Sequence, residues 1–150
     1  MARLTSAIFS LVLMAALLAG SDARAELAKW DQEKVTAAAE QLAQDSVALR
    51  DALRSKPRAT LGQPGRHAFF SLREEVQVLV SASRRLHQAL SDGAGMEETY
   101  PTFRRLVRTV RRGSRQLNRV DLGQDTRARV DAVADVVRKL RPYYEPEPPI

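Results

Sequence analysis

The chain has 150 residues, a formal net charge of +6 and no cysteine. This length favours a single domain, and a domain of this size buries roughly two-thirds of its unfolded surface on folding. The absence of cysteine excludes disulfide bonds, thiolate-ligated metals, covalent haem attachment and a lipid-modified cysteine.

The first 25 residues have the pattern of a secretory signal peptide. A short basic start at Arg3 precedes an apolar run over 7–19, and 23–25 is a small-x-small cleavage site. The run is too short for a membrane span, and an uncleaved membrane anchor is the alternative. We therefore expect an exported chain, periplasmic or secreted, that starts at Glu26. Removing two arginines and one aspartate lowers its formal charge from +6 to +5.

Residues 26–54 are expected to form the first helix. They contain no Gly or Pro and are rich in Ala, Leu, Glu and Gln, which favour helix. Trp30 lies near the start, away from the apolar face, and is expected to cover one end of the bundle. The inner face of this helix is predicted to consist of Val35, Ala39, Leu42, Ser46, Leu49 and Leu53.

Residues 66–91 show the clearest helical periodicity in the sequence. Spacings of three and four residues alternate along a stripe formed by Phe69, Leu72, Val76, Leu79, Ser83, Leu86 and Leu90. This pattern predicts a helix that buries one face against neighbouring helices. The preceding residues 55–65 contain two prolines and two glycines, which predict a loop. The loop is long for a helical bundle, so a crossover, a lid and a slack connection all remain open.

The third helix is expected over residues 101–118, with Pro101 in its first turn after a glycine-containing turn at 92–95. Glu97 and Glu98 precede this start, where acids are favourable for the helix dipole. The inward heptad positions are predicted to hold Phe103, Leu106, Val110, Gly113 and Leu117.

Seven arginines fall at the outward heptad positions of this segment: Arg104, Arg105, Arg108, Arg111, Arg112, Arg115 and Arg119. No acidic residue occurs between positions 101 and 120. Like charges four residues apart cost roughly 0.2–0.5 kcal/mol per pair in an isolated helix, and an anionic partner would offset this cost. Arginine also binds phosphate and carboxylate through paired hydrogen bonds. The alternative is a basic, solvated surface that only keeps the protein soluble.

The fourth helix is expected over residues 125–141. Asp125 is placed to cap its start, and Pro142 is expected to end it. The two tyrosines that follow are expected to pack on the end of the bundle. The inward residues of this helix are predicted to be Val130, Val133, Val137 and Leu140.

These elements predict an all-α protein, a single up-down-up-down four-helix bundle after an N-terminal signal peptide. The expected organisation is a signal peptide over residues 1–25, the bundle over 26–141 and a proline-rich mobile tail over 142–150.

No pattern in the sequence indicates catalysis, a metal site or a resident cofactor. His67 and His87 would lie roughly 30 Å apart on one helix, so they cannot share a metal ion. Ser83, His87 and Ser91 would share a helix face, but a regular helix gives a serine nucleophile no oxyanion hole. We therefore predict a non-enzymatic protein with no cofactor and no metal.

The function expected from these residues is binding or structural. The arginine-rich helix would contact an anionic envelope component or an acidic partner, such as anionic lipid, lipopolysaccharide, acidic polysaccharide or acidic protein. Nucleic acid is a less expected partner, because the protein is exported and the arginines have no aromatic neighbour for base stacking. The alternative is a periplasmic haem or small-ligand carrier with its site inside the bundle, for which Met96 and a histidine are the candidate ligands.

Overall fold

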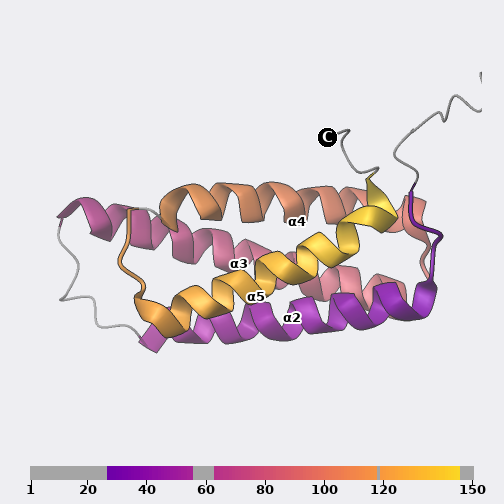
Figure 1. Cartoon of the computed structure of the whole chain (residues 1–150), viewed down its shortest axis with the longest axis horizontal. Coiled ribbons are helices and arrows are strands. Elements are labelled where there is room, and N and C mark those ends of the chain that lie inside the picture. The colour runs from indigo at the N-terminus through magenta and orange to yellow at the C-terminus, as the bar shows by residue number, and fades with distance from the viewer. Residues whose placement is uncertain (1–26, 56–62, 118, 146–150) are drawn as a thin grey trace, which may run out of the picture.

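The computed structural model of this chain describes residues 27–55, 63–117 and 119–145 (Figure 1). These residues form four helices and contain no strand: α2 (Gln32–Ser55), α3 (Gln63–Ser91), α4 (Met96–Leu117) and α5 (Gly123–Tyr144). The predicted all-helical fold is therefore confirmed for this part of the chain. The predicted signal peptide, most of the predicted 55–65 loop and residues 146–150 lie outside the described residues.

Successive helices run in opposite directions and pack side by side (Figure 1). α3 packs along both α2 and α4, and α5 packs mainly on α2. The contact between α4 and α5 is smaller than these three, because α5 crosses the bundle obliquely and approaches α4 near the end of its own course (Figure 1). The buried apolar side chains of all four helices form one core cluster.

The inner faces predicted for the first two helices are confirmed. All six residues predicted for α2 and all seven predicted for α3 are buried. α3 also buries Ala68, Val80 and Ala82 beside its stripe, because it packs against two helices. α3 begins at Gln63, earlier than predicted, and Pro64 lies in its first turn, where a missing N–H costs no helical hydrogen bond.

α2 begins at Gln32, later than predicted, because Asp31 caps it. Oδ1 of Asp31 accepts a hydrogen bond from the backbone N–H of Lys34 at 3.1 Å, and the Lys34 ammonium lies 2.9 Å from Oδ2. These contacts, chiefly the backbone N–H of Lys34, lower the pKa of the Asp31 carboxyl. Trp30 therefore precedes the helix instead of lying in its first turns.

α4 begins at Met96, so the predicted start at Pro101 is wrong. Oε2 of Glu98 accepts a hydrogen bond from the N–H of Gly95 at 2.9 Å, which forms half of a capping box. The Thr99 hydroxyl donates to the Gly95 carbonyl at 2.7 Å and strengthens the same turn. Pro101 consequently lies inside the helix, where the chain loses one backbone hydrogen bond.

The buried face of α4 departs from the predicted heptad line. Val110 and Leu117 are only half-buried. Thr109, three residues after Leu106 and four before Gly113, is buried in place of Val110. The residues that α4 buries are Thr99, Phe103, Leu106, Thr109 and Gly113.

α5 begins at Gly123, and the predicted cap at Asp125 is wrong. Leu122 occupies the N-cap position without a side-chain hydrogen bond, and its own side chain is buried. Gly123 has a φ of 68°, a conformation that favours glycine at this sharp entry to the helix. Val130 is only half-buried, whereas the buried residues of α5 are Thr126, Val133, Val136, Val137, Leu140 and Tyr144.

Pro142 does not end α5, which continues to Tyr144. A proline removes one N–H from the helical ladder, but the turn beyond it still closes. The N–H of Glu145 donates to the carbonyl of Arg141 at 2.8 Å. The N–H of Ala28 donates to the Pro142 carbonyl, also at 2.8 Å, so the segment before α2 is bound to the last turn of α5.

An aromatic cluster closes this end of the bundle. The buried ring of Tyr144 stacks on Phe103 with ring centres 4.2 Å apart, and its hydroxyl is hydrogen-bonded to the Thr99 hydroxyl at 2.9 Å. Trp30 contacts Tyr144 edge-on at 5.4 Å and Tyr143 at 6.4 Å. Burial raises the pKa of the Tyr144 hydroxyl, and the hydrogen bond with Thr99 partly opposes this shift. The predicted packing of Trp30 and both tyrosines on the bundle end is confirmed.

Candidate anion-binding surface

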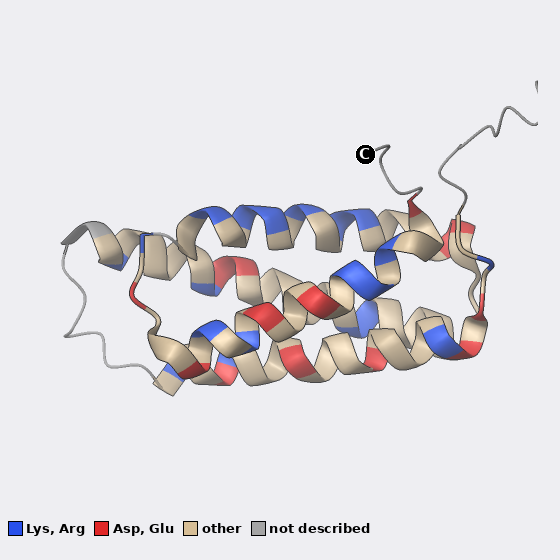
Figure 2. Ribbon diagram, viewed as in Figure 1, with Lys and Arg blue, Asp and Glu red and all other residues tan. Residues whose placement is uncertain are grey.

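Arginines recur along α4, whose ribbon is blue over much of its length in Figure 2. Six of the seven predicted site arginines lie on this helix, and we call them the arginine face: Arg104, Arg105, Arg108, Arg111, Arg112 and Arg115. All six are exposed, as their heptad positions predict. Arg119 is also exposed but follows the end of α4, where its N–H donates to the Gln116 carbonyl at 3.0 Å.

One arginine of the face has an acidic partner on the neighbouring helix. Nε of Arg112 lies 2.9 Å from Oε1 of Glu75 on α3. The second carboxylate oxygen, Oε2 of Glu75, is buried and has no hydrogen-bond partner among the described residues. Removing Arg112 would leave a half-buried carboxylate without its partner, which is unfavourable. Arg112 therefore has a structural role that its position in the sequence does not reveal.

An aromatic ring lies at one end of the arginine face, where none was expected. The guanidinium carbon of Arg104 lies 5.8 Å from the centre of the Tyr100 ring, within range of a cation–π interaction. Tyr100 is half-buried and stacks on Tyr144 with ring centres 6.5 Å apart. The Tyr100 ring thus contacts both Arg104 and the buried Tyr144.

The other four arginines of the face have no ion pair among the described residues: Arg105, Arg108, Arg111 and Arg115. On α2 and α5, by contrast, basic and acidic residues are mixed (Figure 2). Arg50 pairs with Asp51 at 2.9 Å and Arg138 with Asp135 at 2.8 Å. The basic charge of α4 is therefore the least compensated on the described surface.

Like charges within α4 lie close enough to repel one another. Arg104 and Arg108, Arg108 and Arg112, and Arg111 and Arg115 are each four residues apart on one helix. Each pair costs roughly 0.2–0.5 kcal/mol at an exposed site. Arg115 and Arg119 are also four residues apart in the sequence, but they do not face each other on the helix, because α4 ends at Leu117.

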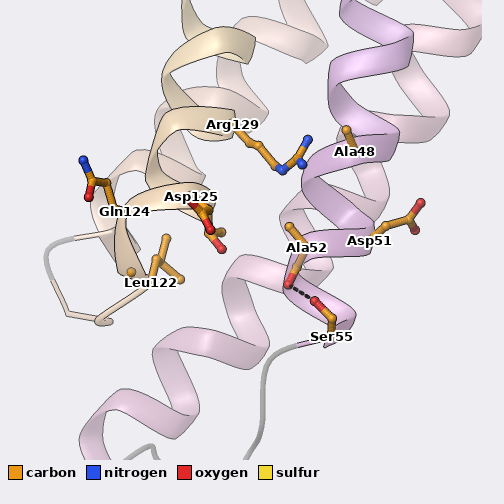
Figure 3. Close-up of a pocket in the computed structure, with 10 residues that line it drawn as sticks. Ala48, Asp51, Ala52, Ser55, Leu122, Gln124, Asp125 and Arg129 are labelled. Carbon is orange, nitrogen blue, oxygen red and sulfur yellow. Dashed lines mark hydrogen bonds between the residues drawn. The ribbon is translucent and has the colours of Figure 1, made fainter.

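A wide surface hollow of about 600 Å³ lies on another side of the bundle, between the end of α2 and the start of α5 (Figure 3). Asp125 points into it, Arg129 reaches toward α2, and Asp51 points away (Figure 3). The Ser55 hydroxyl already donates to the Ala52 carbonyl at 2.9 Å. No histidine is among the lining residues, so the hollow does not pair this serine with an imidazole base.

The described interior has little free space for a cofactor. A cavity of about 40 Å³ lies among the four helices, lined mainly by Leu and Val side chains and by Thr109. Small-molecule sites usually have volumes of roughly 300–1,000 Å³, so a haem would require the helices to separate. The cavity gives no support to the alternative of a haem or small-ligand carrier.

Among the described residues, no hydrogen bond joins the side chains considered as ligands or nucleophiles. His67 is exposed near the start of α3, His87 is half-buried far along the same helix, and Met96 begins α4. Ser83 is buried and donates its hydroxyl hydrogen to the Val80 carbonyl at 3.1 Å. In the described part of the chain, no three His, Cys, Asp or Glu side chains are grouped to hold a metal ion.

These features define a class of protein, an all-α bundle with one strongly basic outer helix. None of the helices described is both long enough and apolar enough to cross a membrane. Comparison with protein-family models, with curated proteins and with solved structures finds no significant match. Function must therefore be argued from the surface itself.

Proposed function

We propose that this protein is a non-enzymatic binding module that contacts an anionic partner through the arginine face. One observation carries the proposal: Arg105, Arg108, Arg111 and Arg115 are exposed and have no ion pair among the described residues. Phosphate or carboxylate groups placed along α4 would replace repulsion between these side chains by charge-assisted hydrogen bonds.

The proposed location is outside the cytoplasm, either periplasmic or secreted. The pattern of residues 1–25 supports this location, with the helical bundle following the predicted cleavage site. Partners available there are anionic lipids, lipopolysaccharide, acidic polysaccharides and acidic proteins. Mass spectrometry of the exported protein should find Glu26 as its first residue, and retention of Met1 in a membrane fraction would contradict cleavage.

Replacing Arg108, Arg111 and Arg115 with glutamine should weaken binding to anionic vesicles roughly hundredfold at low salt, since each basic side chain near an anionic bilayer contributes about 1 kcal/mol. Arg112 is left unchanged because it pairs with Glu75. Cosedimentation with vesicles that contain phosphatidylglycerol measures the effect. Binding of the unmodified protein should also weaken as salt rises to physiological strength, because exposed charges are screened.

A matched control removes three positive charges from other helices, with Arg84, Arg127 and Lys139 changed to glutamine. These side chains are exposed and have no ion pair among the described residues. The control should bind vesicles nearly as well as the unmodified protein. If the arginine-face variant binds vesicles as well as the unmodified protein does, the arginine face only keeps the protein soluble. Equal losses in both variants would show that only total charge matters.

A further inference from the structure

A groove of about 250 Å³ between α3 and α4 adjoins the arginine face. From α3 it is lined by Gln77, Ser81 and Arg85, which recur every four residues and therefore share one side of the helix. From α4 it is lined by Thr102 and Arg105, which are three residues apart. The groove therefore brings an arginine of the face together with an arginine of the neighbouring helix.

This groove is positively charged on both walls. Arg85 and Arg105 are exposed, neither has an ion pair among the described residues, and no carboxylate lines the groove. Two acids of α3 and α4 are engaged elsewhere, since Glu98 accepts a backbone hydrogen bond at the start of α4 and Glu75 pairs with Arg112. Glu74 of α3 has no ion pair among the described residues and lines a different hollow. Glu75 of α3 forms an ion pair with Arg112 of α4. Arg85 of α3, by contrast, has no counterion among the described residues.

Neutral hydrogen-bonding groups line the groove together with the two arginines. The Thr102 side chain is half-buried, and its hydroxyl has no hydrogen-bond partner among the described residues. The Ser81 hydroxyl already donates its hydrogen to the Gln77 carbonyl at 3.1 Å, so it offers an anion no free donor. The Gln77 side chain adds an amide with two N–H donors. The groove is therefore rich in donors for an anion that has several acceptor oxygens.

We propose that this groove binds a phosphate group, held between Arg85 and Arg105 with the Thr102 hydroxyl as a further donor. A phosphate presents three or more oxygens in a tetrahedral arrangement, so donors from two helices can be used at once. A carboxylate has only two oxygens in one plane and matches a single guanidinium better. The inference rests on the proposed function and narrows its partner to a molecule that carries phosphate, either a lipid headgroup or a soluble phosphate ester.

Nuclear magnetic resonance titration of the full chain with inorganic phosphate tests the groove directly. The Nε–H signals of Arg85 and Arg105 and the amide signal of Thr102 should shift together and saturate, while that of Arg84 should move little. An Arg85→Gln, Arg105→Gln variant should lose at least about tenfold in phosphate affinity, because two charge-assisted donors are removed. An Arg84→Gln, Arg127→Gln control removes the same charge outside both the groove and the arginine face and should retain the affinity.

Vesicles that contain phosphatidic acid separate the two sources of phosphate. If the groove variant loses binding to these vesicles but still binds inorganic phosphate, the ligand is a lipid headgroup. If it loses inorganic phosphate but still binds the vesicles, the ligand is a soluble phosphate ester. Loss of both supports the groove for either source. Unchanged binding by the groove variant, or equal losses in variant and control, overturns the phosphate site.

The arginine-face variant then distinguishes the two proposals. If the phosphate site fails but changing Arg108, Arg111 and Arg115 still abolishes vesicle binding, the proposed function stands without the groove. If neither set of substitutions affects binding, both proposals fail.

Discussion

Replacing Phe103 with alanine should lower the free energy of unfolding by about 3–5 kcal/mol, the usual cost of truncating a fully buried aromatic side chain. Phe103 is 0% exposed, and its ring stacks on Tyr144 at 4.2 Å with an angle of 12° between the planes. The substitution therefore removes core volume and the ring contact that joins α4 to the last turn of α5. Urea unfolding followed by circular dichroism measures the loss.

Phe70 provides a matched control for this prediction. It is the same residue type, but its side chain is 42% exposed on α3. Phe70→Ala should destabilise the protein clearly less than Phe103→Ala, because less apolar surface returns to water. If both variants lose the same free energy, or if Phe103→Ala costs less than about 0.5 kcal/mol as at a surface site, the described contact between α4 and α5 is wrong.

Leu79→Ala should cost about 2–5 kcal/mol, because Leu79 lies in the middle of the stripe on α3. Its side chain is 3% exposed, and α3 packs against two other helices. A cavity at this position therefore removes contacts that the surrounding helices cannot easily restore. Denaturant unfolding again gives the free-energy difference.

Leu79→Met tests whether the effect comes from lost volume. Methionine nearly conserves the size of leucine, so this variant should cost less than about 1.5 kcal/mol. Leu79→Asp buries an uncompensated charge and should prevent folding. Full stability in the alanine variant would show that the stripe of α3 does not lie in the core.

The interior faces of α2 and α3 follow from the sequence alone. Every residue of their predicted stripes is buried, including Ser46 and Ser83, which are polar but small. A residue every three or four positions defines one side of a helix whatever that side meets, so the pattern is a local property of the chain. The outward position of the arginines on α4 follows from the same geometry.

Helix ends were less predictable, because capping hydrogen bonds and contacts between distant segments decide them. Pro101 and Pro142 were expected to mark a start and a stop, yet both lie inside helices. The carboxylate of Glu98 starts α4 five residues before Pro101 by binding the N–H of Gly95. The end of α5 continues beyond Pro142 because Tyr144 packs on Phe103, a contact between segments far apart in the sequence.

The sequence by itself determined that the chain forms amphipathic helices and that one helix is basic outside. Only the tertiary structure decided what each arginine meets: Arg112 meets a carboxylate of α3, whereas Arg105 lies in a groove with Arg85. The physical reason is that helical spacing fixes the side on which a residue lies, but not the residue opposite it. That residue depends on how far α3 and α4 slide along each other, which the packing of their buried side chains sets.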